Sequence, residues 1–342
     1  MTDMPSSAQQ WVFSNPHRNA PDEPLPPHPA FATWETYVCP IVPASGDYEY
    51  FVEEAFRLHS AVTSFGAENM WLAHHAGEFQ DRAQNLKSGE WKDTASLIES
   101  GANQYGARPG VSHGGAVMNS LVDDYGSFAS FRKNAGRIIE FGGYDVAGDR
   151  SVDEILAEMH AAGARAAMLK RRWRKNELIK VDMSSWTPGM SVMEMVDEEG
   201  KWALINDSEL SEAYLVQEFV PMRYEYRTFI IGQKPVTGAG CFDDFSPLDN
   251  EGLAFDTRVR EYRFADVPGP LESRPDIVKT LVDFAWKVAD ELTAEMPYLD
   301  RYVIDTALDE NGCPLVIELN GESNAGFYAC RPELITEALA NL

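Results

Sequence analysis

Residues 302–320 contain the pattern that most constrains the fold, because two apolar, β-branched runs flank the dipeptide Asn311-Gly312. Asn-Gly readily adopts the two positive φ angles of a two-residue type I′ turn, so the segment predicts a β-hairpin. If these two residues form the turn, counting outward along both strands places Asp305 directly opposite Glu318. Asn320 then shares a face with Glu318, because side chains alternate along a strand.

The two faces of this hairpin differ in character. On the polar face Asp305 and Glu318 oppose each other, and two facing carboxylates repel unless a cation lies between them. Asp, Glu and Asn supply the oxygen ligands that Mg²⁺ binds, usually together with the oxygens of a phosphate chain. The alternative is a solvent-facing hairpin whose acids align by chance in an acidic chain. The other face is apolar and predicts a core contact; it carries Ile304, Leu308, Leu315, Ile317 and Leu319.

Residues 165–180 concentrate positive charge, with seven basic residues and one acidic residue in a chain whose formal charge is −25. Such a concentration predicts a polyanionic ligand or a partner. Lys170 and Lys180 lie in two expected strands, 164–170 and 177–182, rather than in the turn between them. This placement favours both lysines as point charges on phosphate oxygens. A basic turn that pairs with acidic neighbours is the alternative.

Residues 213–231 predict two further strands. The first is an apolar run interrupted by Gln217-Glu218. In the second, Arg223, Glu225 and Arg227 alternate and are therefore expected to share a face. The guanidinium of Arg227 suits a phosphoryl group, because it can donate to two oxygens at once. The alternative is an ion-pair ladder along the strand.

The D…E-x-N arrangement of Asp305, Glu318 and Asn320 resembles the metal-binding end of the ATP-grasp family. Residues 213–231 look like the linker strand that lines the adenine pocket in that family, followed by its E-x-R strand. Residues 164–181 supply two lysines where the family keeps its phosphate-binding pair. The resemblance runs from about residue 150 to the end of the chain, and it lacks a glycine-rich loop between the lysines.

The resemblance implies an α/β chain with an ATP-grasp fold, in which two α+β subdomains, 151–212 and 213–342, grip ATP. A smaller substrate-side domain at 31–150 would precede them. The implied reaction is ATP- and Mg²⁺-dependent: a carboxylate is activated as an acyl phosphate and joined to the amine of an amino acid, peptide or small molecule. Arg227 and Lys180 would be catalytic, and Asp305, Glu318 and Asn320 would bind the metal. The implied ATP contacts are Lys170, Lys180, Gln217, Glu218, Phe219, Val220, Glu225 and Arg227.

Several helices and loops follow from local signals. Ser151 with Glu154 forms a capping box, which predicts a helix to about residue 162. Helices are also expected at 275–292 and 332–342. The polar stretch 243–266 is long enough to predict a lid or substrate loop. In the N-terminal part, a proline-rich extended or disordered tail is expected at 1–30, a strand at 34–42, a helix at 50–64 and a surface loop at 101–115.

Composition limits the kinds of partner and the kinds of site that the sequence predicts. The acidic surface predicts no nucleic acid partner, and no apolar run is long enough to predict a membrane span. Four cysteines lie far apart without a C-x-x-C pair, which argues against a zinc site and a disulfide scaffold and fits a reducing cytoplasm. A homo-oligomer stays possible.

Two other functions stay open. Lys180-Val181-Asp182-Met183 is one residue short of the K-x-D-G signature of covalent nucleotidyltransferases such as nucleic acid ligases. In that reading Lys180 would carry AMP. The second alternative is a nucleotide-binding protein without catalysis that acts through its partners.

Overall fold

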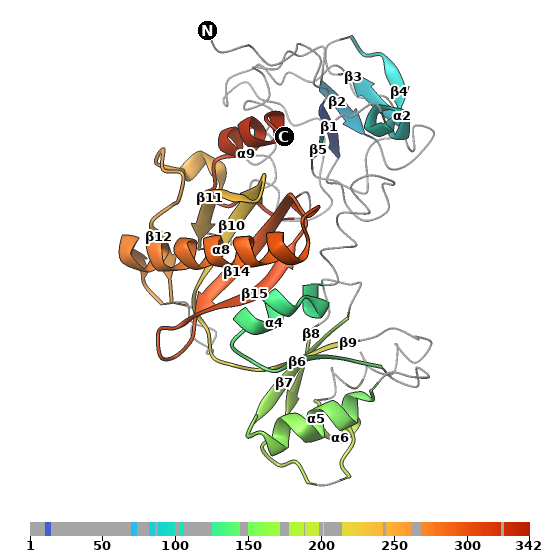
Figure 1. Cartoon of the computed structure of the whole chain (residues 1–342), viewed down its shortest axis with the longest axis vertical. Coiled ribbons are helices and arrows are strands. Elements are labelled where there is room, and N and C mark those ends of the chain that lie inside the picture. The colour runs from blue at the N-terminus through green and yellow to red at the C-terminus, as the bar shows by residue number, and fades with distance from the viewer. Residues whose placement is uncertain are drawn as a thin grey trace.

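The structure, a computed structural model, describes residues 11–14, 70–73, 82–85, 88–99, 103–105, 125–143, 150–171, 178–187, 189–197, 201, 214–241, 244–261, 269–322 and 325–342. This part of the chain forms one five-stranded and two four-stranded sheets, and a short two-stranded sheet (Figure 1). No helix in it is long and apolar enough to cross a membrane. The two four-stranded sheets enclose the candidate site.

The five-stranded sheet has the order β4-β3-β2-β1-β5. Its strands are β1 (Trp11–Ser14), β2 (Met70–Ala73), β3 (Arg82–Asn85), β4 (Trp91–Asp93) and β5 (Asn103–Tyr105), and α2 (Thr94–Glu99) follows β4. β1 pairs in parallel with both β2 and β5. Within the expected tail at 1–30, residues 11–14 thus form an extended strand that hydrogen-bonds to neighbouring strands on both sides. The strand expected at 34–42 and the helix at 50–64 lie outside the described residues.

The first four-stranded sheet is antiparallel, with the order β6-β9-β7-β8. It contains β6 (Ile139–Gly142), β7 (Ala166–Arg171), β8 (Leu178–Asp182) and β9 (Tyr214–Glu218). The capping box of Ser151 and Glu154 opens α5 (Val152–Ala161) as predicted, and α6 (Val192–Met195) lies nearby. Because β6 precedes residue 150 and β9 follows residue 212, the sheet takes strands from across both expected domain boundaries.

Alternation along β7 and β8 gives this sheet one apolar and one polar face. Leu169, Ile179 and Val181 are buried against α5 in a single apolar cluster. Met168, Lys170 and Lys180 point the other way, because side chains alternate along each strand. The polar face is therefore the one available to a ligand.

The second four-stranded sheet is also antiparallel, with the order β11-β10-β14-β15. Its strands are β10 (Arg223–Ile231), β11 (Lys234–Gly240), β14 (Arg301–Leu308) and β15 (Pro314–Asn320). α8 (Pro275–Glu295) covers one face and α9 (Pro332–Ala340) the other, which confirms both predicted helices (Figure 1).

A short helical segment joins the two sheets. The 3-10 turn η5 (Tyr125–Ser127) and α4 (Ala129–Asn134) precede β6, and Phe131 is fully buried. One apolar cluster contains residues of α4, β6, β9, α8, β14 and β15. This shared core fixes how the two sheets face each other.

The hairpin of β14 and β15 differs from the prediction at its turn. Gly312 has φ +80°, whereas Asn311 does not have a positive φ, so the type I′ turn is wrong. The Asp309 side chain instead accepts the backbone N–H groups of Asn311 at 2.8 Å and of Cys313 at 2.7 Å. The Asp309 N–H donates to the Cys313 carbonyl, which shifts the pairing by one residue.

A β-bulge then restores the predicted register. Thr306 pairs with Val316 and Asp305 pairs with Glu318, so Ile317 is the extra residue in β15. The bulge also corrects one predicted core residue: Ile317 is only half-buried and lines a cavity, whereas Val316 is fully buried. The turn and the bulge compensate each other, and Asp305 faces Glu318 as predicted.

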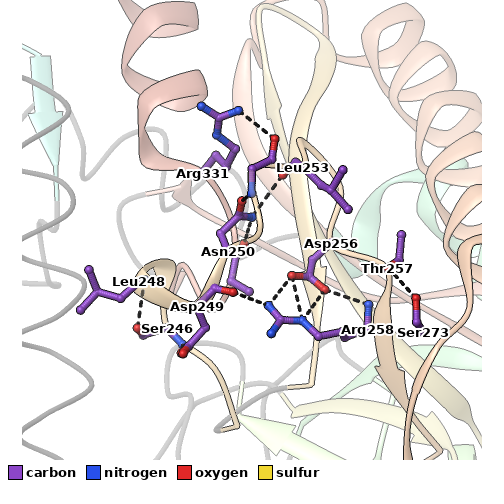
Figure 2. A network of polar contacts seen from close by, with 12 residues as sticks. Ser246, Leu248, Asp249, Asn250, Leu253, Asp256, Thr257, Arg258, Ser273 and Arg331 are labelled. Carbon is purple, nitrogen blue, oxygen red and sulfur yellow. Dashed lines mark hydrogen bonds and ion pairs between the residues drawn. The ribbon is translucent and has the colours of Figure 1, made fainter.

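The stretch expected as a lid, 243–266, is folded and anchored in the part that the structure describes. It contains the 3-10 turn η6 (Pro247–Asp249) and β12 (Arg258–Arg260), which pairs with β13 (Leu271–Ser273). Figure 2 shows Arg258 bonded to the Asp256 carboxylate and the Asp249 carbonyl. Arg331 donates to the Gly252 carbonyl. These bonds tie residues 249–258 to the start of α9.

Candidate functional site

A cavity of about 410 Å³ lies between the polar face of the first sheet and the end of β15. This volume is typical of sites for small ligands. One part of the wall is apolar and comes from the connection between β9 and β10, with Phe219, Val220 and Met222. Another part is charged and contains Lys170 and Glu318. The cavity therefore suits a ligand with a flat apolar portion and an anionic portion.

The strand register shows how the charged and the apolar parts of the cavity wall follow each other along β9. Lys170 of β7 pairs with Leu215 of β9, and Met168 pairs with Gln217. Two residues span roughly 7 Å along a strand, so Gln217 lies about that far from the level of Lys170, in the direction of the apolar connection. The backbone N–H of Val220, in that connection, makes no hydrogen bond to the described residues. It is available to a ligand.

The predicted metal-binding residues come together at one point. The Asn320 side-chain amide donates to Oδ2 of Asp305 at 3.0 Å and to Oε1 of Glu318 at 2.9 Å. Asp305 is 1% exposed. Two carboxylates and an amide oxygen on one face are the donors that a hard cation takes, with phosphate oxygens completing the set. No cluster of three or more His, Cys, Asp or Glu side chains suited to a metal occurs in the described part of the chain. A magnesium site here would need ligand oxygens.

Each of these acids also contacts a cation. Arg227 binds Asp305 in a fork, with Nε 2.9 Å from Oδ1 and Nη2 2.7 Å from Oδ2. Lys170 forms an ion pair with Glu318, and its Nζ lies 3.3 Å from the Tyr125 hydroxyl. Burial disfavours the charge on Lys170, but Glu318 and Tyr125 outweigh burial and raise its pKa. Asp305 likewise outweighs burial and raises the pKa of Arg227. Both cations stay charged at neutral pH.

The remaining predicted residues divide into two groups. Gln217, Glu218, Phe219, Val220 and Glu225 line the cavity together with Lys170 and Glu318. Lys180 is exposed, with Nζ 4.6 Å from the centre of the Phe219 ring, and it is not among the lining residues. Arg227, Asp305 and Asn320 lie beyond Glu318, away from the lining. The functional roles of all these residues stay predictions.

The prediction that Arg223, Glu225 and Arg227 share a face is wrong for Arg223. Tyr224 has φ +55°, and the register of β10 against β14 shifts by one residue between Arg223 and Tyr226. Arg223 therefore pairs with Leu308, on the face that α8 covers, and forms an ion pair with Glu261 at 3.1 Å.

Arg137 is a cavity residue that the sequence did not indicate. It precedes β6 and follows Gly136, whose φ is +64°. Its guanidinium bonds Gln217 of β9 and the carbonyls of Val316 and Ile317 in the β15 bulge, so it connects the two sheets. Burial lowers the pKa of Arg137 to about 10, against the opposing effect of Tyr125, and the group stays charged at neutral pH. A single arginine after a glycine carries no motif that could have identified it.

No protein-family model and no curated protein matches the chain. The solved structures to which it is similar include ATP-grasp ligases. D-alanyl-alanine synthetase A from Vibrio cholerae is 10% identical, with 97% of this chain and 94% of that chain covered, at a TM-score of 0.48. ATP-grasp ligase PsnB complexed with a minimal precursor is 10% identical, with 98% and 99% covered, also at 0.48.

A second PsnB structure, complexed with minimal precursor, Mg and ADP, is 13% identical at a TM-score of 0.36. The alignment covers 82% of this chain and 64% of the PsnB chain. Similarity at these levels bears on no individual residue of the site, which rests on the contacts described above.

Proposed function

We propose that this protein is an ATP-grasp ligase that uses ATP and Mg²⁺ to activate a carboxylate and join it to an amine. The observation that carries the proposal is that Lys170 and the Glu318 carboxylate form an ion pair in the wall of one cavity, while the buried amide of Asn320 bridges Glu318 to Asp305 behind that wall. An anion-binding cation next to a pair of acids is what a magnesium–polyphosphate complex requires. The apolar connection at residues 219–222 provides a surface for the base.

In this proposal Asp305, Glu318 and Asn320 hold the metal. Bound Mg²⁺ would neutralise charge on the phosphate oxygens. Lys170 supplies a fixed positive charge on the polar face of the first sheet. Arg227 keeps Asp305 oriented through two hydrogen bonds, and its charge lies on the same side of the sheet. Phosphoryl transfer needs positioning and charge neutralisation more than a nucleophilic side chain, so the proposal requires no nucleophile among these residues.

The proposed reaction transfers the γ-phosphoryl group of ATP to a substrate carboxylate, which gives ADP and an acyl phosphate. Attack by an amine then expels phosphate and forms an amide-type bond. A free carboxylate resists this attack because its oxygen is a poor leaving group. We expect amino acids or peptides as substrates, and a cytoplasmic location.

The test is a labelled-ATP experiment with pools of amino acids and peptides. The protein is incubated with Mg²⁺ and ATP labelled at the α-phosphate, and products are separated from protein. The proposal expects ADP release that depends on a carboxylate and an amine, with no label on the protein. Pyrophosphate release and a labelled protein, with the label absent in Lys180→Ala, would instead establish the nucleotidyltransferase alternative.

A matched pair of variants links turnover to the cleft. Glu318→Gln removes one charge from the proposed metal site, and Glu310→Gln makes the same change at the exposed turn of the same hairpin. ADP release should be lost in the first and kept in the second. Equal release by both would show that the reaction occurs elsewhere. ATP binding without turnover in every pool would favour the non-catalytic alternative.

A further inference from the structure

The guanidinium of Arg137 has no donor left for a ligand. It donates to Oε1 of Gln217 from Nε at 3.3 Å and from Nη2 at 2.7 Å, and to the carbonyls of Ala135, Val316 and Ile317 at 2.9, 2.7 and 2.7 Å. An arginine has five N–H groups, and these five contacts use all of them. Arg137 is therefore a positioning residue rather than a ligand-binding one.

This bonding fixes the orientation of the Gln217 side chain. A guanidinium donates only, so the amide atom that faces Arg137 must be the oxygen, and Nε2 must point the other way. Gln217 is 8% exposed and lines the cavity. Within the described residues, no group accepts a hydrogen bond from Nε2. Nε2 therefore faces the cavity as an unused donor, which an acceptor on a bound ligand would pair at this point.

The position of Gln217 selects the acceptor. It lies between the level of Lys170, where phosphates are proposed, and the connection at 219–222, where the base is proposed. In an anti purine nucleotide, the N7 edge of the base lies on the side of the 5′ phosphates. N7 is a hydrogen-bond acceptor in adenine, whereas the exocyclic N6 is a donor that Nε2 could not satisfy.

We infer that Gln217, held by Arg137, donates a hydrogen bond to N7 of the bound purine. This inference rests on the proposed function, because it assumes that ATP occupies the cleft. The contact distinguishes a purine from a pyrimidine or a 7-deazapurine. It does not by itself distinguish adenine from guanine, which also carries N7.

The experiment compares the dissociation constants of ATP and 7-deaza-ATP by isothermal titration calorimetry, with Mg²⁺ present. 7-deaza-ATP replaces N7 with a C–H group and leaves the phosphates unchanged. The wild-type protein should bind it about tenfold more weakly than ATP, the effect of one lost hydrogen bond to a partly buried donor. Gln217→Met has a similar length and no donor, so it should bind both nucleotides with equal affinity.

Gln217→Glu provides a second, independent variant. Its carboxylate keeps an oxygen towards Arg137 and places another oxygen where Nε2 was, so two acceptors would meet at N7. The preference should then reverse, with 7-deaza-ATP bound more tightly than ATP. Because this variant retains the Arg137 contact, it separates loss of the donor from loss of local structure.

The outcomes are distinguishable. Equal binding of ATP and 7-deaza-ATP by the wild-type protein overturns the inference and leaves the proposed ligase intact. A preference for ATP that persists in Gln217→Met assigns N7 recognition to another residue and also overturns it. Failure of the wild-type protein to bind either nucleotide overturns the proposed function and this inference together.

Discussion

Substituting Asp305 with Asn tests whether the buried charge pair behaves as the geometry requires. The Arg227 side chain is 9% exposed and Asp305 is 1% exposed, and they share two hydrogen bonds. Asp305→Asn keeps the shape, removes the negative charge and leaves the buried Arg227 charge uncompensated. Breaking one partner of a buried pair costs about 3–5 kcal/mol, so we expect a loss of that size in the free energy of unfolding.

Glu318→Gln is the matched comparison, because it also neutralises an acid that faces a cation. The Lys170 and Glu318 side chains are 15% and 26% exposed, so water screens that pair more strongly. We expect a smaller loss, about 1–2 kcal/mol. Urea denaturation of both variants measures the difference as a shift in midpoint at unchanged slope.

A double variant determines whether uncompensated charge is the cause. Arg227→Met with Asp305→Leu removes both charges and replaces them with apolar side chains of similar size, so it should recover much of the stability lost in Asp305→Asn. A double variant less stable than Asp305→Asn would show that lost packing dominates. An Asp305→Asn variant as stable as the wild type would refute the reasoning at its base.

The remaining predictions concern binding and pH. Lys170→Ala should weaken ATP binding about tenfold, and more than Lys180→Ala, because Lys170 lines the cavity and Lys180 is exposed; calorimetry of both variants with Mg²⁺ checks the order. Glu295 accepts bonds from the Ser130 hydroxyl and from the backbone N–H groups of Ser130 and Ala129 at the start of α4. Burial raises its pKa, but these bonds outweigh burial and lower the pKa below the ordinary value of 4.5. Its contribution is therefore present above pH 4.5 and lost as pH falls through the lowered pKa. Glu295→Gln should cost about 1 kcal/mol or less at pH 7, since the group is exposed, and nothing at low pH; unfolding midpoints at the two pH values check this.

The sequence correctly predicted the pairing of Asp305 with Glu318, although the turn from which that pairing was counted is wrong. Asn-Gly favours a type I′ turn, yet the side chain of Asp309 accepts the Cys313 N–H, which would have donated to the Glu310 carbonyl in that turn, and also accepts the Asn311 N–H. The resulting one-residue shift is cancelled by the bulge at Ile317. Alternation along one strand cannot reveal either change, because both depend on bonds to other segments. The predicted pairing on the polar face is nevertheless correct, because the one-residue shift at the turn and the one-residue bulge at Ile317 cancel each other.

Residues that act across elements were beyond sequence reasoning. Arg137 bonds to β9 and to β15, which are 80 and 180 positions away along the chain. No local spacing encodes such contacts. The predicted position of Arg223 is wrong for a related reason. The positive φ of Tyr224 interrupts the strand alternation, so Arg223 does not share a face with Glu225. By contrast, the helices at 151–162, 275–292 and 332–342 were predictable, because capping residues and apolar periodicity are local.

The charges of the cleft explain how so acidic a chain tolerates two facing carboxylates. Arg227 offers its fork to Asp305, so the same two donors cannot also hold a phosphoryl group while that contact lasts. The Oδ1 atom of Asp305 accepts only the Nε of Arg227 among the described residues. A carboxylate oxygen accepts two bonds, so Asp305 can ligate a cation there without releasing Arg227. In the proposed function, Arg227 would therefore orient Asp305 as a metal ligand, and Lys170 would be the cation nearest to the phosphates.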